Sequence, residues 1–87
     1  MIDHYDEFNL KITKLGLYSK LSENQVRGGS GIDDIDGILV YKNSFVVKKN
    51  ENGCLVLTLP KGNTRKEYLV NNLLECIPFI HDHYIDK

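Results

Sequence analysis

The feature that most constrains the fold is a series of short apolar segments separated by turn residues in the middle of the chain. These segments are residues 38–42, 45–49 and 54–60. Asn43-Ser44 separates the first two, and residues 50–53, which end in Asn52-Gly53, separate the last two. Asn-Gly strongly favours a hairpin because both residues tolerate positive φ. The pattern therefore predicts an antiparallel β-meander, whose third strand ends at Pro60 because proline cannot donate to the ladder.

The sequence pattern of residues 64–86 predicts a helix after this meander. Thr64 and Glu67 have the spacing of a capping box, and apolar side chains then recur at helical spacing at Leu69, Leu73, Cys76, Ile77, Ile80 and Tyr84. We expect a kink, or two short helices, near Pro78. In the alternative, residues 65–70 form a fourth strand and the helix starts at residue 71. The prediction is an α+β fold, an antiparallel β-meander of three to four strands with a C-terminal amphipathic helix.

The N-terminal part of the chain is less regular. Residues 9–18 are interpreted as a strand, because Leu10 and Ile12 alternate with polar residues and Gly16 disfavours a helix. The alternation changes phase near Lys14, which indicates a bulge. Residues 19–37 contain four glycines and few apolar residues, so they predict a long, flexible loop.

A chain of 87 residues is long enough for a single domain, residues 1–87, with a small hydrophobic core. A homodimer would enlarge that core, and both a monomer and a homodimer remain open. No apolar run approaches the ~18 residues of a membrane span, so no membrane partner is expected. The first eight residues carry three acids and no base, which does not resemble a secretory signal and predicts a cytoplasmic protein. The absence of Ala and Trp beside eight Asn, eight Ile and nine Lys suggests an AT-rich bacterial or phage genome.

The net charge of −1 conceals a basic centre between acidic ends. Residues 37–68 hold six bases against two acids, whereas the flanking segments are both acidic. Five of these bases are expected to lie side by side where the meander meets its helix, namely Lys48, Lys49, Lys61, Arg65 and Lys66. Such a cluster would contact phosphates, although it could equally be a solvated surface that keeps edge strands soluble. Tyr41 and Tyr68 lie within the same segment and could stack on bases or fill the core.

Other candidate sites have little support in the sequence. Cys54 has no identifiable His partner, Cys76 lies on the apolar helical stripe, and no carboxylate pair stands out, so a non-enzyme is expected. His81 and His83 would share a face on a strand and could bind zinc there with His4. On a helix they point about 200° apart, so no metal is expected. Residues 28–31 lack the Lys and Ser/Thr of a phosphate-binding loop, residues 33–37 lack a calcium-loop pattern, and no cofactor is expected.

Three segments together resemble the SpoVG (stage V sporulation protein G, septation regulator) family. They are Phe45-Val46-Val47, the run from Asn52-Gly53 to Leu59-Pro60-Lys61, and Arg65-Lys66-Glu67-Tyr68-Leu69, within about residues 38–86. The resemblance implies a small dimeric DNA- and RNA-binding regulator with an antiparallel sheet and a C-terminal helix. It implies that Lys61, Arg65 and Lys66 take part in binding. The residues around 22–37 have no counterpart in that family.

The sequence thus predicts a small, non-enzymatic nucleic-acid-binding regulatory protein, for DNA or RNA, that contacts the phosphate backbone through its basic cluster. The alternative is a protein-interaction module, such as a small phage- or plasmid-encoded inhibitor of a host nuclease or regulator. In that alternative, residues 27–37 would bind the protein partner, because they are rich in Gly and Asp.

Overall fold

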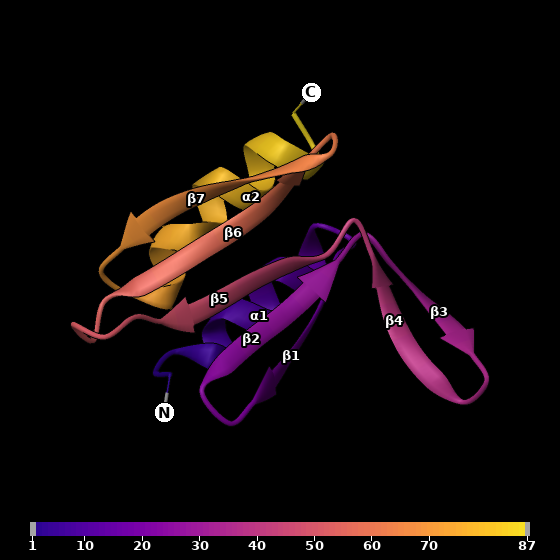
Figure 1. Cartoon of the computed structure of the whole chain (residues 1–87), viewed down its shortest axis with the longest axis horizontal. Coiled ribbons are helices and arrows are strands. Elements are labelled where there is room, and N and C mark those ends of the chain that lie inside the picture. Colours follow the sequence, from indigo (N-terminus) through magenta and orange to yellow (C-terminus); the bar gives the residue numbers. More distant parts are fainter. Residues whose placement is uncertain (1, 87) are drawn as a thin grey trace.

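The computed structural model describes residues 2–86 as an α+β fold, in which both helices cover the same face of an antiparallel sheet (Figure 1). The elements in chain order are α1 (Tyr5–Lys14), β1 (Tyr18–Ser22), β2 (Gln25–Gly29), β3 (Gly31–Ile35), β4 (Ile38–Lys42), β5 (Phe45–Lys49), β6 (Leu55–Lys61), β7 (Thr64–Val70), the 3₁₀ turn η1 (Leu73–Glu75) and α2 (Cys76–Tyr84). Five strands form the main sheet in the order β1-β2-β5-β6-β7. β3 and β4 form a separate two-stranded hairpin, which we call the arm (residues 31–42) and which projects away from the sheet.

The three predicted meander strands are all confirmed as strands, but only the second and third pair as predicted, as β5 and β6. The first, residues 38–42, is β4 and pairs with β3 in the arm, so the observed meander is β5-β6-β7. In the Asn-Gly turn, Gly53 has the expected positive φ, at 81°, whereas Asn52 does not. The turn is also held by Asn50, whose Oδ1 accepts hydrogen bonds from the backbone N–H groups of Asn52 and Cys54. Pro60 does not end β6, which continues to Lys61. Proline is tolerated there because the pairing of β6 with β5 ends two residues earlier, at Thr58.

The helix predicted from residue 64 is wrong for its first nine residues, and the alternative of a fourth meander strand is correct. Thr64 is not a helix cap, since its hydroxyl donates to the Lys61 carbonyl across the β6–β7 turn. Gly62 adopts a φ of 60° in that turn. β7 then pairs with β6 along its whole length, from Thr64 opposite Lys61 to Val70 opposite Leu55. Backbone pairing with the free edge of β6 thus makes a strand of a segment whose sequence also suits a helix.

The C-terminal helical segment begins at a cap that the prediction missed. Asn72 is the N-cap, and its Oδ1 accepts from the backbone N–H groups of Leu74 and Glu75. Glu75 Oε1 in turn accepts from the N–H of Asn71. The segment divides between η1 and α2, so Pro78 lies in the first turn of α2 and does not kink it.

The strand predicted over residues 9–18 is also wrong, because α1 occupies Tyr5–Lys14. Phe8 and Ile12 lie one helical turn apart and are fully buried against the sheet. Acids in the first turn and lysines in the last turn stabilise the helix, because their charges interact favourably with the helix dipole. Gly16, with a φ of 81°, then lets the chain turn into β1.

The long loop predicted over residues 19–37 is wrong as well, because these residues form β1, β2 and β3. Two-residue turns at Glu23-Asn24 and Asp36-Gly37 connect the strands, and three of the four turn residues have positive φ. Gly28 is required by packing: a Cβ there would lie 2.5 Å from the Phe45 ring and 2.1 Å from the Tyr18 carbonyl oxygen.

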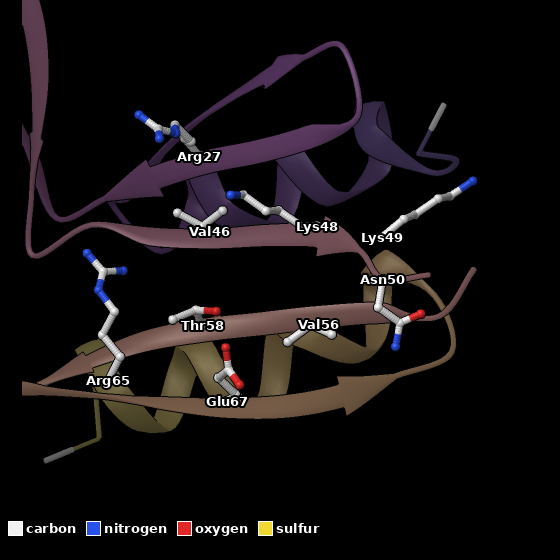
Figure 2. Close-up of a pocket in the computed structure, with 9 residues that line it drawn as sticks. All are labelled: Arg27, Val46, Lys48, Lys49, Asn50, Val56, Thr58, Arg65 and Glu67. Atoms are coloured by element: carbon white, nitrogen blue, oxygen red, sulfur yellow. The ribbon is translucent and has the colours of Figure 1, made fainter. Parts of the chain in front are cut away.

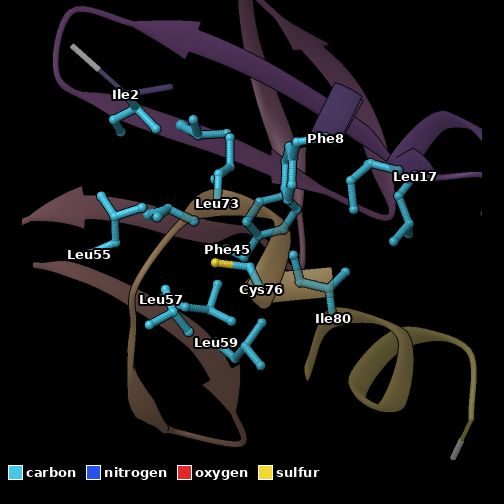
Figure 3. Packing of buried hydrophobic residues seen from close by; sticks show 14 residues of the cluster. Ile2, Phe8, Leu17, Phe45, Leu55, Leu57, Leu59, Leu73, Cys76 and Ile80 are labelled. Carbon is cyan, nitrogen blue, oxygen red and sulfur yellow. The ribbon is translucent and has the colours of Figure 1, made fainter. Parts of the chain in front are cut away.

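The hydrophobic core lies between the sheet and the two helices (Figure 3). Alternate residues of β5 and β6 point into it, and the rings of Phe8 and Phe45 meet edge to face at 6.3 Å. Its fully buried side chains are Phe8, Ile12, Val26, Phe45, Val47, Leu57, Leu73, Cys76 and Ile80. The helices therefore cover one face of the sheet and leave the other face open.

Within the described part of the chain, neither helix combines the length and apolar character that crossing a membrane would need.

Candidate nucleic-acid interface

The open face of the main sheet follows from strand alternation. In β5 and β6 the buried residues alternate with partly exposed ones, so Val46, Val56 and Thr58 point away from the helices. The registers extend this assignment across the sheet, because directly paired residues share a face. We call this surface the open face. Its remaining large or charged members are Tyr18, Lys20, Arg27, Lys48, Arg65, Glu67 and Leu69.

Four cations and a single acid are presented by the strands on the open face. The cations are Lys20, Arg27, Lys48 and Arg65, which come from β1, β2, β5 and β7, and all four are exposed. The acid is Glu67 of β7. None of the five side chains forms a salt bridge with any residue in the range 2–86. The face therefore carries uncompensated positive charge.

The centre of the open face is a shallow depression of about 550 Å³ (Figure 2). Val46 and Val56 form its apolar floor, and the Thr58 hydroxyl lies between Val46 and Glu67. The guanidinium groups of Arg27 and Arg65 stand on either side of Val46, at the same end of the depression. This arrangement can hold an extended anionic chain, with apolar contacts below and charges along both borders.

Lys20 lies directly opposite Arg27 on the neighbouring strand. Like charges in this position repel each other, since directly opposed Cβ atoms are only ~5 Å apart. The next residue along this row of the sheet is Val46, which provides no counter-charge. A bound anion between Lys20 and Arg27 would replace this repulsion with attraction.

Two of the five predicted cations lie on the open face, and a third lies at its rim. Lys48 and Arg65 belong to the open face, and Lys49 lies at its rim. Figure 2 shows the Lys49 side chain pointing away from the other two. Lys49 also borders a second hollow, next to Leu55 and Leu73 on the helix-covered side.

The other two predicted cations lie on the opposite side of the sheet. Lys61 borders a hollow with His83 and Tyr84 at the end of α2. Lys66 projects over the Tyr68 ring, with its Nζ 5.4 Å from the ring centre. The expectation that all five cations converge is therefore wrong, because Lys61 and Lys66 alternate with the open-face residues of β6 and β7.

Neither predicted stacking tyrosine belongs to the open face, but Tyr41 borders it in a hollow of about 380 Å³ that Arg27 and Arg65 also line. Tyr68 stacks on Phe79 of α2, with ring centres 4.4 Å apart, and packs against the core. Tyr41 is a half-buried residue at the base of the arm. Burial, and to a smaller extent Tyr5, raises its pKa above the usual 10.0. The open-face aromatic residue is Tyr18, which is 48% exposed.

Sequence reasoning missed three residues of the open face, Tyr18, Lys20 and Arg27, because their segment was interpreted as the end of a strand followed by a loop. A signal for the β1–β2 hairpin is present but weak. Leu21 and Val26 flank a polar four-residue segment and alternate with Lys20 and Arg27. Glu23-Asn24 is a less distinctive turn than Asn-Gly.

The remaining reactive side chains do not form a site. Cys76 is completely buried, and burial, reinforced by Glu75, raises the pKa of its thiol to about 12. Cys54 is exposed after the β5–β6 turn. His81 and His83 lie two residues apart on α2 and point in different directions. Across residues 2–86, no group of three His, Cys, Asp or Glu side chains could hold a metal ion.

Comparison of the chain with protein families, with curated proteins and with solved structures finds no match.

Proposed function

We propose that this chain is a non-enzymatic nucleic-acid-binding protein whose open face contacts the phosphate backbone. One observation carries the proposal: four strands present cations on one face, where Lys20 opposes Arg27 without a counter-charge. Phosphate contacts supply most of the affinity of such surfaces. The resemblance to the SpoVG family over residues 38–86 supports the same class and a regulatory role.

The shape of the open face favours a single strand over a duplex. Val46 and Val56 provide an apolar floor where sugars and bases can lie, and Tyr18 adds an exposed ring at one end. Sheet surfaces that combine cations with apolar and aromatic side chains suit unpaired nucleotides. We therefore expect single-stranded DNA or RNA to bind more tightly than a duplex of the same length.

The test is a fluorescence-anisotropy titration of labelled single-stranded and duplex oligonucleotides at several salt concentrations. The variant Arg27→Ala/Lys48→Ala removes two open-face cations, and Lys61→Ala/Lys66→Ala removes the same charge from the opposite side. The first variant should reduce the slope of log K against log salt by about 1.4 to 1.8, since each phosphate contributes roughly 0.7 to 0.9. The second variant should leave the slope close to that of the parent chain.

Two results would overturn the proposal. One is the absence of binding to any of the oligonucleotides at low salt. The other is an equal loss of slope in the two variants, which would indicate that net charge matters and the face does not. All four substituted side chains are exposed, so both variants should fold.

A second candidate function is a protein-interaction module, such as an inhibitor of a host nuclease or regulator. The observation that favours it is the apolar surface of the arm, where Ile38 and Leu39 are 67% and 63% exposed. Capture of partners from a host lysate, with and without residues 31–42, tests this candidate. A partner that is retained equally by the shortened chain would exclude a role for the arm.

A further inference from the structure

The arm exposes more apolar surface than any other segment of comparable length in the described chain. Five of the nine exposed large apolar residues within residues 2–86 belong to it, namely Ile32, Ile35, Ile38, Leu39 and Val40. A two-stranded hairpin is at best marginally stable when it stands alone in water. An exposed apolar hairpin on a small protein therefore indicates a surface that another chain covers.

The arm is also acidic. It carries Asp33, Asp34 and Asp36 against Lys42, which pairs with Asp33 at 3.4 Å. Asp34 accepts a hydrogen bond from the Gly37 N–H and, like Asp36, has no salt-bridge partner among residues 2–86. The arm therefore combines net negative charge with an apolar surface.

The open face has the complementary combination. Its cations surround Val46 and Val56, and Leu69, at 71% exposed, extends the apolar area. An acidic, apolar hairpin and a basic, apolar sheet face match each other in both respects. These two surfaces are present on every copy of the chain, so a second copy can supply the missing partner.

The base of the arm is held so that the arm projects at an angle from its own sheet (Figure 1). Between β4 of the arm and the open face of the same copy lies a hollow of about 380 Å³, which Arg27 and Arg65 also line. The Ser30 N–H donates to the Lys42 carbonyl at 3.0 Å, and the Tyr84 hydroxyl donates to the Asn43 carbonyl. Gly29 permits the close approach of the Lys42 carbonyl, which a Cβ there would meet at 2.2 Å. These contacts fix the direction of the arm and leave both its strand edges unpaired.

We infer that two copies of this chain form a homodimer by exchanging arms, with the arm of each copy lying on the open face of the other. A two-fold axis makes both contacts identical, so the association closes at two copies. The carboxylates of each arm then meet the cations of the other copy's open face, among them Arg27 and Arg65. If the proposed function is correct, the arm and the nucleic acid compete for the same face, and nucleic acid dissociates the dimer.

The test is a charge swap followed by sedimentation equilibrium without nucleic acid. Asp33→Lys/Asp34→Lys makes the arm basic, and Arg27→Glu/Arg65→Glu makes the open face acidic. Each variant alone should remain monomeric, because its arm and face then carry the same sign. An equimolar mixture should form a heterodimer, since both of its arm–face contacts join opposite charges. The parent chain should sediment with twice the monomer mass.

A parent chain that stays monomeric up to roughly 1 mM would overturn the inference. The same conclusion follows if the two variants do not associate when mixed, provided that both retain the far-UV circular dichroism of the parent chain. A dimer that both variants retain would place the interface elsewhere. Because no oligonucleotide is present, these outcomes are independent of whether the proposed function is correct.

Discussion

Single residues in this structure owe their identity to close packing more than to chain flexibility. Gly28 lies in a glycine-rich stretch whose composition suggests a loop, yet the Phe45 ring occupies the space where its side chain would be. The same principle applies to the rim of the core, where the Tyr84 hydroxyl donates to Asn43 while its ring meets Phe45 at 6.2 Å. Sequence composition alone does not reveal which neighbouring side chain requires a glycine at such a position.

Gly28→Ala should destabilise the fold by about 1–3 kcal/mol, because the new methyl group overlaps the fully buried Phe45 ring and the Tyr18 carbonyl. Urea unfolding followed by circular dichroism measures the change. Gly31→Ala is the matched control: its nearest neighbour is the flexible Lys42 side chain at 3.3 Å, so a change within about 0.5 kcal/mol is expected. Equal stability of the Gly28 variant and the parent chain would show that Phe45 does not pack on Gly28.

Alkaline pH should destabilise the protein through Cys76. Burial raises the pKa of this thiol from 9.0 to about 12, so the folded chain keeps a proton that the unfolded chain releases. The stability that this group contributes is complete below pH 9 and is lost as pH rises toward 12, by at most about 1.4 kcal/mol per pH unit. Burial of Tyr84, whose pKa is raised to about 12, acts in the same direction from pH 10.

Urea unfolding at several pH values between 8 and 11 checks this dependence. Cys76→Ala should flatten the decline in the free energy of unfolding, whereas Cys54→Ala, at the exposed cysteine, should retain it. The measured quantity is the slope with pH, so any loss of packing in the Cys76 variant does not affect the comparison. Identical slopes in the two variants would refute the assignment.

At the scale of elements, the predictions succeeded where a short apolar segment is bounded by turn residues. Residues 38–49 and 54–60 were recognised as strands because apolar segments alternate with turns that side chains such as Asn50 stabilise locally. β7 was predicted only as the alternative, because its segment also suits a helix and becomes a strand by pairing with the free edge of β6. The β3–β4 hairpin has a local signal, since Asp36-Gly37 between two isoleucines is a strong two-residue turn.

The candidate site was predictable only in part, for the same reason. Lys48, Lys49 and Arg65 could be named because the basic centre of the chain is visible in the sequence, but their face depends on register. Lys61 and Lys66 were expected beside the other cations because a helix start was predicted where β7 forms. Lys20 and Arg27 join the site only through the pairing of β1, β2 and β5, which no local pattern specifies.

The η1–α2 segment depends on its cap. Asn72→Ala removes the side-chain oxygen that accepts from the Leu74 and Glu75 N–H groups, and should cost about 1 kcal/mol of stability. Thermal and urea unfolding measure this loss. Asn71→Ala is the control, because the Asn71 side chain makes no hydrogen bond within residues 2–86 and only its backbone bonds to Glu75. A loss that is equal in the two variants would contradict the role of the cap.

At the scale of the whole molecule, the sheet separates two surfaces with different roles. The helix-covered face contains the core, and the open face gathers cations from four of the five strands of the main sheet. The acidic arm leaves the sheet between β2 and β5, next to the basic face. The central claim is that the open face is the surface that binds nucleic acid.

Methyl chemical-shift mapping during titration with a single-stranded oligonucleotide tests this claim most directly. Val46 and Val56 report on the open face, whereas Val47 and Leu57, their immediate neighbours along the same strands, are completely buried on the other side. We predict that the methyl signals of Val46 and Val56 shift strongly and in proportion to occupancy, while those of Val47 and Leu57 change little. Shifts confined to the residues around Lys61 and Lys66, with Val46 and Val56 unchanged, would contradict the account.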